Sequence, residues 1–322
     1  MKNILSNFVK EHRVFMAPMT GLTDYPFRKT LSSFTSIPSY SEMVASREII
    51  YSNDKVKKKL YRNNNSSFFI IQILGNEPYL MSEAAKYCEQ LGADIIDINM
   101  GCPSKKVTGK LSGSALMRNL NEANDIIKSV VNSVKLPVTL KMRLGWDENN
   151  LNAPEISKAA EENGVKLITI HGRTRCQFYK DYANWKEVRK VKNNVLLPII
   201  VNGDIYDNNS ARRALEESSA DGVMIGRAAI GRPWILQKIL SNINNSIVYR
   251  KVSTLDKYNF ISQHYEEILS HYGFELGVRV ARKHLIKYFQ YQKELPTKLV
   301  NLTIRSESPK FVKNSLKSMY LN

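Results

Sequence analysis

Residues 68–74 read FFIIQIL, residues 95–100 read IIDINM and residues 198–203 read PIIVNG. Each run is almost continuously apolar and carries a polar residue close to its end. Continuous apolar runs of this length are typical of parallel strands that are covered on both faces, whereas half-exposed strands alternate. These three runs therefore indicate a buried parallel sheet.

Similar runs recur along the first 230 or so residues and predict eight strands. Between most of them lie segments with apolar residues at helical spacing, which predict covering helices. Eight strands that alternate with helices indicate a (β/α)8 TIM barrel. A doubly wound open sheet is the alternative, but it gives no reason for eight similar units. The predicted strands are Val14–Met19, Ser39–Val44, Phe69–Leu74, Ile95–Met100, Val138–Arg143, Leu167–Gly172, Pro198–Gly203 and Gly222–Arg227. The predicted helices are Pro78–Leu91, Leu120–Val134, Ala153–Asn163, Trp185–Val191 and Asn208–Ser218.

The pattern changes near the polar stretch Ser241–Ser246, beyond which the only strand-like run is the brief Ser246–Val248. Three helical segments follow, at Thr254–Tyr272, Leu276–Tyr291 and Ser308–Leu321. We therefore predict a barrel domain over residues 1–245 and a small all-helical C-terminal domain over residues 246–322. The least clear unit of the barrel is the second, because residues 46–64 are polar and rich in lysine.

The charge balance indicates a polyanionic partner. The chain has 47 Lys and Arg against 30 Asp and Glu, a net charge of +17, and residues 246–322 alone hold 13 against 6. A solubilising excess is the plainer explanation, since charge alone does not define a function. The cysteines Cys88, Cys102 and Cys176 are too few for a disulfide framework, and no metal-binding spacing is present, so no metal site is expected. No apolar run reaches about 18 residues, so we expect a cytoplasmic protein without a membrane span.

Polar residues end most of the predicted strands. In a TIM barrel the active site lies at the carboxyl ends of the strands. Any one such residue is more often structural, but a ring of them on six successive strands predicts a site. Small residues after the last two strands let backbone N–H groups approach a phosphate. We expect this phosphate to belong to a cofactor that lies over the barrel. The ring consists of Gln72, Asn99, Lys141, Arg143, His171, Arg173, Asn202, Gly203, Asp204, Gly226 and Arg227.

Cys102 follows the fourth predicted strand in a turn bracketed by Gly101 and Pro103. A free cysteine is usually a buried small hydrophobe, as we expect for Cys88. The lysine-rich loop around Cys102 instead favours a reactive thiol. Three lysines, at positions 105, 106 and 110, would lower its pKa if they were close. We expect them to face the polyanionic partner instead.

Six ordered motifs in this chain resemble those of the tRNA-dihydrouridine synthases. They are APMTGLTD (residues 17–24), DINMGCP (97–103), KMR (141–143), HGRT (171–174), NGD (202–204) and GRA (226–228). The similarity extends from about residue 10 to about residue 290. The segments SEM (41–43), KKV (105–107), GW (145–146) and RVARKH (279–284) are most similar to the bacterial B-type branch. Thr20 departs from the family pattern, where alanine is usual.

The resemblance implies an enzyme that binds FMN, is reduced by NADPH or NADH, and reduces a uridine in the D-loop of tRNA. It implies that Cys102 is the general acid and that Asn99, Arg143 and Arg173 lie near the substrate. The cofactor contacts that it implies are Pro18, Met19, Thr20, Gln72, Lys141, His171, Asn202, Gly203, Asp204, Gly226 and Arg227.

Two alternatives remain open at this point. A flavin-dependent reductase of free pyrimidines would share the barrel and the cofactor, but it does not explain the basic helical tail. An RNA-binding protein without turnover would explain the tail, but it does not explain the intact ring of polar residues and Cys102.

Overall fold

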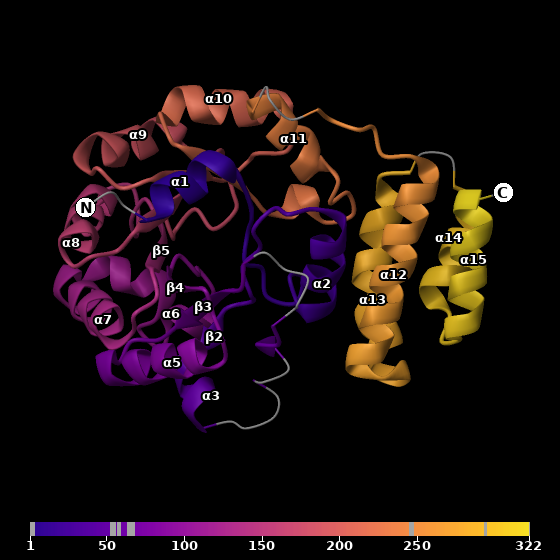
Figure 1. Ribbon diagram of the computed structural model, residues 1–322, viewed down its shortest axis with the longest axis horizontal. Helices are drawn as coiled ribbons and strands as arrows, with labels where there is room; N and C mark the ends of the chain where they lie inside the picture. The colour runs from indigo at the N-terminus through magenta and orange to yellow at the C-terminus, as the bar shows by residue number, and fades with distance from the viewer. Residues whose placement is uncertain are drawn as a thin grey trace.

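The structure is a computed structural model that describes residues 4–51, 56, 59–62, 68–244, 248–292 and 295–321. Figure 1 shows a barrel with its covering helices on one side and a layer of C-terminal helices on the other. The predicted boundary between residues 245 and 246 lies outside the described residues, as does most of the brief run Ser246–Val248. Much of the lysine-rich stretch at 46–64 also lies outside them.

Eight parallel strands form one sheet in the order β1-β8-β7-β6-β5-β4-β3-β2. Single parallel bridges join Met16 to Ser39 and Tyr40 to Ile70, so the segment between β1 and β3 closes the circle. The TIM barrel is thereby confirmed. The second predicted strand is interrupted, since residues 39 and 40 make only those bridges. The strands are β1 Val14–Met16, β2 Val44–Ala45, β3 Ile70–Leu74, β4 Ile95–Met100, β5 Val138–Arg143, β6 Leu167–His171, β7 Ile199–Asn202 and β8 Gly222–Ile225.

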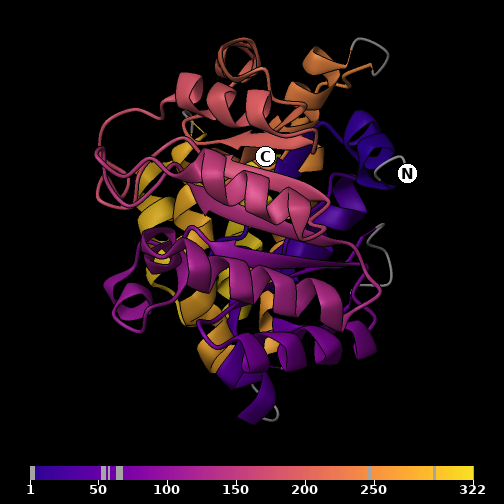
Figure 2. The same ribbon diagram turned by 90° about the vertical axis from the view of Figure 1, so that its left-hand side faces the viewer.

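Helices surround the sheet, as Figure 2 shows from the side. The five predicted helices are confirmed to within a few residues, and their first turns carry recognisable start signals. Pro78 opens α5, Asn119 caps α7 by accepting a hydrogen bond from the N–H of Glu122, and Asp207 caps α10. These helices are α5 Pro78–Gln90, α7 Leu120–Ser133, α8 Ala153–Glu162, α9 Trp185–Asn194 and α10 Asn208–Ser218. Sequence reasoning missed α1 Ile4–Glu11, α2 Tyr25–Phe34, α3 Ser46–Tyr51, α6 Lys105–Thr108, α11 Ile235–Ile243 and the short 3-10 helices Gly113–Arg118 and Arg227–Ala229.

The interior of the barrel changes from apolar to polar along the strands. Alternate residues of a strand share a face, so Ile95, Asp97 and Asn99 of β4 lie on the same face at successive levels. At the amino end, Ile95 belongs to a buried apolar cluster with residues of other strands and with Leu5 and Phe8 of α1. Helix α1 therefore closes that end. The polar residues are left at the opposite end, where the predicted site lies.

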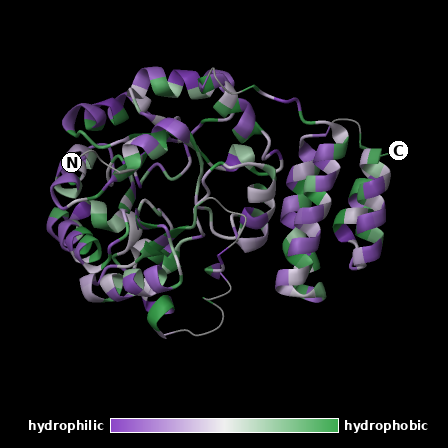
Figure 3. Ribbon diagram, in the orientation of Figure 1, coloured by the Kyte–Doolittle hydropathy of each residue, from purple (hydrophilic) through white to green (hydrophobic). Residues whose placement is uncertain are grey.

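The C-terminal part is all-helical, as predicted. Its helices pack around their own apolar cluster, in which Phe260, Tyr265, Leu285 and Leu316 are buried. Figure 3 shows hydrophobic and hydrophilic residues side by side on these helices, the pattern of an amphipathic layer. Helix α2 of the barrel packs against α12 and lies between the two parts in Figure 1. The four helices are α12 Thr254–Tyr272, α13 Phe274–Gln290, α14 Thr297–Arg305, which was not predicted, and α15 Pro309–Leu321.

Within the part of the chain that the structure describes, no helix combines the length and the apolar character that a bilayer crossing requires.

Candidate active site

The loop after β4 holds Cys102 in a fixed position at the carboxyl end of the barrel. The side-chain Oδ1 of Asn99 accepts hydrogen bonds from the backbone N–H groups of Gly101 (3.1 Å) and Cys102 (3.0 Å). The Cys102 carbonyl accepts from the Ser114 hydroxyl at 2.8 Å. Gly113 has φ +63°, and a Cβ there would lie 3.0 Å from the same carbonyl. The loop therefore depends on glycine at 113 and on the orientation of Asn99.

A chain of buried hydrogen bonds sets that orientation. Asp97 accepts from Thr139 Oγ1 and from Gln72 Nε2, both at 2.6 Å. Since a carboxylate only accepts, Gln72 must turn its amide oxygen the other way, where it accepts from Asn99 Nδ2 at 2.7 Å. Burial raises the pKa of Asp97 to about 6, although the bonds from Gln72 and Thr139 oppose the shift. Asp97 is therefore ionised at neutral pH and anchors the chain.

Asp97 and Thr139 were not among the predicted site residues. The spacing of two between Ile95, Asp97 and Asn99 is the signal that could have found Asp97, because it places a carboxyl group directly below Asn99 in the barrel. The predicted contacts Gln72 and Asn99 are both buried, at 1% and 7% exposure. Gln72 bonds Asp97 and Asn99, and Asn99 bonds Gln72 and the cysteine loop.

Arg143 joins two loops at the end of the barrel. Its Nε donates to the carbonyl of Gly101 (2.9 Å), and its Nη1 donates to the carbonyls of Thr174 (2.7 Å) and Phe178 (2.9 Å). The side chain is only 1% exposed. Arg143 thus joins the cysteine loop to the loop after β6. The hydrogen bonds above use Nε and Nη1, so Nη2 is the nitrogen that they leave for a ligand.

Arg173 is the centre of a second network. Its Nη2 donates to both carboxylate oxygens of Asp204 (2.8 and 2.6 Å) and to the carbonyl of Asp181 (2.7 Å). Its Nε donates to the carbonyl of Lys180 (2.9 Å), and its Nη1 lies 3.2 Å from His171 Nε2. The residue is 2% exposed and all three of its nitrogens are engaged. Arg173 therefore positions neighbouring groups.

The contact with Arg173 fixes the tautomer of His171. A guanidinium group can only donate, so Nε2 of the imidazole accepts and Nδ1 carries the proton. Burial lowers the pKa of His171 well below its usual value, and the charges of Arg143 and Lys141 lower it further. His171 is therefore a neutral hydrogen-bond donor at pH 7.

Lys141 lies on β5 and donates from Nζ to Asn202 Oδ1 at 3.2 Å. Asn202 in turn donates to the Met224 carbonyl at 2.8 Å, which orients its oxygen toward the lysine. Burial lowers the pKa of Lys141 to about 8, with Asp97 opposing the shift. Among the described residues the ammonium makes this one hydrogen bond, so two of its donors remain for an acceptor on a ligand.

The loops after β7, β8 and β1 meet beside these residues. Gly203 has φ +111°, and a Cβ there would lie 2.8 Å from the His171 ring. Asp204, also at positive φ, accepts from the Ala183 N–H at 2.7 Å and faces Arg227 at 3.7 Å. A Cβ on Gly226 would lie 3.5 Å from Met19 Sδ, which brings the predicted Pro18–Thr20 segment to the same place. The structure therefore brings the predicted ring together.

The Cys102 thiol is kept protonated. Burial raises its pKa, and the backbone N–H of Ser104 together with the charges of Arg143 and Lys141 opposes this only in part. The loop lysines Lys105, Lys106 and Lys110 are exposed. Cys88 is fully buried in the core, as predicted, and its pKa is raised to about 12. Cys176 is exposed.

A family model described as "Dihydrouridine synthase (Dus)" matches residues 15–318. The chain belongs to the dihydrouridine synthase family. The resemblance found in the motifs is thereby confirmed over nearly the whole chain.

Named relatives agree with this assignment. A "Probable tRNA-dihydrouridine synthase" of Rhodobacter capsulatus is 50% identical over 273 residues, which cover 84% of each protein. A "tRNA-dihydrouridine synthase B" of Pasteurella multocida is 40% identical over 286 residues, 89% of this chain and 86% of that one. The solved structure of FabK from Thermotoga maritima is 15% identical, with 72% of this chain and 63% of that chain covered and a TM-score of 0.43.

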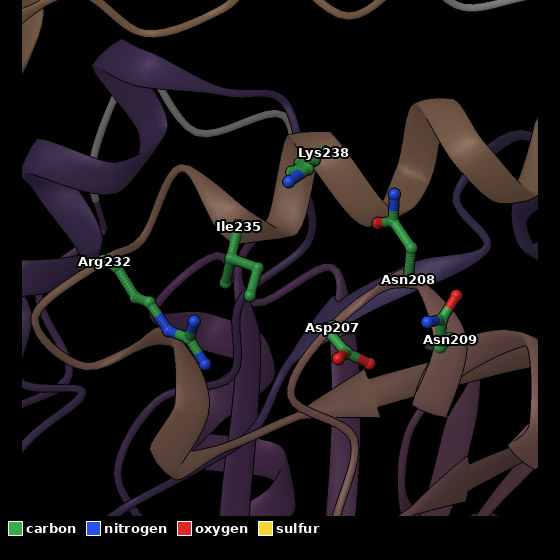
Figure 4. Close-up of a pocket in the computed structure, with 6 residues that line it drawn as sticks. All are labelled: Asp207, Asn208, Asn209, Arg232, Ile235 and Lys238. Atoms are coloured by element: carbon green, nitrogen blue, oxygen red, sulfur yellow. The ribbon is translucent and has the colours of Figure 1, made fainter. Parts of the chain in front are cut away.

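This dihydrouridine synthase has a separate cavity of about 320 Å³ between the start of α10 and α11 (Figure 4). Asp207, Arg232, Ile235 and Lys238 line it together with two asparagines. The Arg232 guanidinium is committed to the carbonyls of residues 228 and 206, at 3.0 and 2.9 Å. None of the predicted cofactor and substrate residues is among the residues that line this cavity.

Proposed function

We propose that this protein reduces the C5=C6 bond of a D-loop uridine in tRNA, with FMN as cofactor, NADPH or NADH as reductant and Cys102 as general acid. The observation that carries the proposal is the position of Cys102. A protonated thiol stands on a rigid loop next to a ring of cationic and hydrogen-bonding groups. Family membership narrows the reaction to dihydrouridine formation.

The residues present fit FMN. The two uncommitted donors of Lys141 and the Nδ1–H of His171 suit the acceptor edge of a flavin, where negative charge accumulates on reduction. The glycines at 203 and 226 leave backbone free of side chains next to Arg227, as a phosphate requires. We therefore assign Lys141, His171, Asn202, Gly203, Gly226, Arg227 and the Pro18–Thr20 segment to the cofactor.

Two predicted cofactor contacts receive different roles in the proposal. Gln72 and Asp204 act through others: Gln72 orients Asn99, and Asp204 holds Arg173 and the loop after β6. The predicted substrate residues Asn99, Arg143 and Arg173 likewise position the cysteine loop and His171.

FMN held by these residues would supply a hydride for C6 of the uracil. Cys102 would donate the proton that C5 then needs, leaving its sulfur as a thiolate. A raised pKa keeps this proton on the thiol at neutral pH, which is the state that a general acid needs. Arg143 and Lys141 are close enough to stabilise the resulting thiolate until solvent restores the proton.

A basic surface adjoins the site and suits the phosphates of tRNA. Arg279 and Lys287 of α13 are exposed. Lys283 of the same helix reaches the loop after β1, since a Cβ on Gly21 would lie 3.5 Å from its Nζ. A cavity of about 490 Å³ nearby is lined by Arg232, Lys238, Lys251 and Lys257, among others. RNA loops can extrude a base cheaply, which suits reduction on a buried cofactor.

The affinity for FMN should fall as pH rises above about 8. Lys141 has a pKa near 8 in the free protein, and an anionic ligand raises it in the complex. The affinity for FMN then has its full value below about pH 8. Above that pH it declines by up to about tenfold per pH unit, until the pH reaches the pKa of Lys141 in the complex. Fluorescence titration of the apoprotein measures this. Lys141→Gln should bind more weakly at pH 7 and lose this decline, and a wild-type affinity that stays constant from pH 7 to pH 10 would refute the role of Lys141.

Binding of tRNA should weaken steeply with salt. If about five phosphates are contacted, raising salt from about 50 to about 200 mM should reduce affinity by about 100- to 500-fold. Lys287→Gln should lower the slope of log affinity against log salt by about one. Lys86→Gln on α5, which removes a lysine paired with Glu83, is the control and should leave the slope unchanged. A salt-independent affinity would exclude this surface as the tRNA site.

A direct assay separates the proposal from its alternatives. The purified chain should be yellow with a flavin spectrum, and NADPH should bleach it. Unmodified tRNA should then restore the colour and gain dihydrouridine. Restoration by free uridine or uracil instead would indicate a reductase of free pyrimidines. A colourless protein that binds tRNA would indicate a binding protein without turnover.

A further inference from the structure

Three metal-binding types of side chain meet where the barrel joins the C-terminal helices. Asp24 caps the start of α2, His264 lies in the middle of α12, and His284 lies in α13. Their candidate ligand atoms all lie within 4.8 Å of one another. Each residue is at most 2% exposed. The sequence gives no metal-binding spacing here, because most of the chain separates Asp24 from the two histidines.

Both imidazoles carry a buried nitrogen that the surrounding protein leaves unsatisfied. Nε2 of His264 and Nε2 of His284 have no hydrogen-bond partner among the described residues. A buried polar atom without a partner is costly, and native proteins rarely leave two in contact. The two rings lie 4.7 Å apart between centroids, and each offers a candidate ligand atom within 4.8 Å of the other and of Asp24.

The other contacts of these residues match those of metal ligands. His264 Nδ1 lies 2.9 Å from the Tyr288 hydroxyl. A metal-bound histidine almost always engages its second nitrogen in this way, which fixes the ring and leaves the first nitrogen for the ion. Asp24 accepts from the Phe27 N–H (3.1 Å) and from the Tyr272 hydroxyl (2.9 Å), which orient its carboxylate.

We propose that Asp24, His264 and His284 bind a Zn²⁺ ion that joins the C-terminal helices to the barrel. Two imidazole nitrogens and one carboxylate oxygen are a donor set that zinc accepts, whereas Ca²⁺ and Mg²⁺ prefer oxygen ligands alone. Zinc ligands at about 2.0 to 2.2 Å from the ion lie roughly 3 to 4 Å apart. The candidate ligand atoms lie within 4.8 Å of one another, so they must approach one another on binding, and a fourth ligand would complete a tetrahedron.

Charged groups of both signs surround the cluster. Arg28 and Lys283 are close enough to act on Asp24 with positive charge, and Glu42 adds a second carboxylate. The carboxylates of Asp24 and Glu42 therefore offset these two neighbouring cations.

The proposed ion would have a defined structural effect. Asp24 ends the APMTGLTD segment, whose Pro18–Thr20 part lies at the end of the barrel. His264 and His284 belong to the helices that carry the basic surface. Zinc would therefore fix the tRNA-binding helices relative to the loop after β1.

The test is the metal content of the full-length protein. The chain, produced without a metal-affinity tag, is treated with chelator, incubated with Zn²⁺ or Co²⁺ and dialysed. We expect one equivalent of zinc per chain by elemental analysis, a higher melting temperature with zinc, and the visible absorption of tetrahedral Co²⁺. His264→Gln and His284→Gln should lose all three, whereas His271→Gln, which alters another histidine of α12, should keep them.

Three results would overturn the proposal: no retained metal in the wild type, equal retention in the two cluster variants, or a thiolate-to-cobalt charge-transfer band, which would place the ion on a cysteine. If the cluster variants do not fold, the wild-type metal content and cobalt spectrum decide alone. The outcome does not depend on catalysis, so it is distinguishable from a failure of the proposed function.

Discussion

Cys102→Ala should reduce uridine in tRNA at least about 100-fold more slowly than the wild type when the pre-reduced enzyme is mixed with tRNA in a single turnover. A general acid typically raises a reaction rate by about 10² to 10⁴, and the replacement removes the thiol that we propose as the proton donor. Reduction of the enzyme by NADPH should be unchanged, because that step does not use the thiol. Rapid-quench analysis of dihydrouridine measures the first rate, and flavin absorbance measures the second.

Cys176→Ala is the matched control, since this thiol is exposed. It should behave as the wild type in both steps. Equal single-turnover rates for Cys102→Ala and the wild type would remove Cys102 from the mechanism and leave only its structural position.

Arg173→Met should lower the free energy of unfolding by about 3 kcal/mol and impair FMN binding. Removal of one partner from a buried, hydrogen-bonded ion pair typically costs about 3 to 5 kcal/mol, and the 20% exposure of Asp204 places this pair at the lower end. The substitution also frees His171 Nε2 and the carbonyls of Lys180 and Asp181. Urea denaturation of the apoprotein measures the stability, and flavin titration measures the binding.

Arg213→Met offers a control with the same change of residue at the surface. Arg213 pairs with Glu217 at 3.2 Å but its side chain is 67% exposed, so the loss should stay below about 1 kcal/mol. If Arg173 served only to bind uridine, its replacement would raise the KM for tRNA and leave stability and FMN binding intact. That result would contradict the network described here.

The eight strands could be predicted because strands buried on both faces leave long apolar runs, and IIDINM and PIIVNG are unmistakable. The second strand is less regular than predicted, because residues 39 and 40 make only single bridges and the paired strand itself begins at Val44. Helix α1 was missed for another reason. Leu5, Phe8 and Val9 fall on one helix face, but a helix of 8 residues shows this pattern only once. Its role, which is to close the amino end of the barrel, depends on tertiary contacts.

The sequence indicates candidate site residues by their position at the strand ends, but it does not show most of their hydrogen-bond partners. Arg143 and Arg173 bind backbone carbonyls of Thr174, Phe178 and Lys180, and a carbonyl carries no trace in the sequence. The position of an arginine at the end of a strand therefore suggests that it lies at the site. Only the fold shows whether its N–H groups are already bonded to the protein or are available for a ligand.

The protonation of Cys102 shows a similar limit. Lys105, Lys106 and Lys110 are near it in sequence and suggested a lowered pKa. The structure leaves these lysines exposed, and burial raises the pKa instead. Proximity in sequence was a poor guide to electrostatic proximity.

Dihydrouridine mapping of tRNA from a strain that lacks the gene tests the central claim most directly. The account predicts that specific D-loop dihydrouridines disappear, that the wild-type gene restores them, and that the gene for Cys102→Ala does not. An unchanged set of dihydrouridines in the deletion strain, or full restoration by Cys102→Ala, would contradict it.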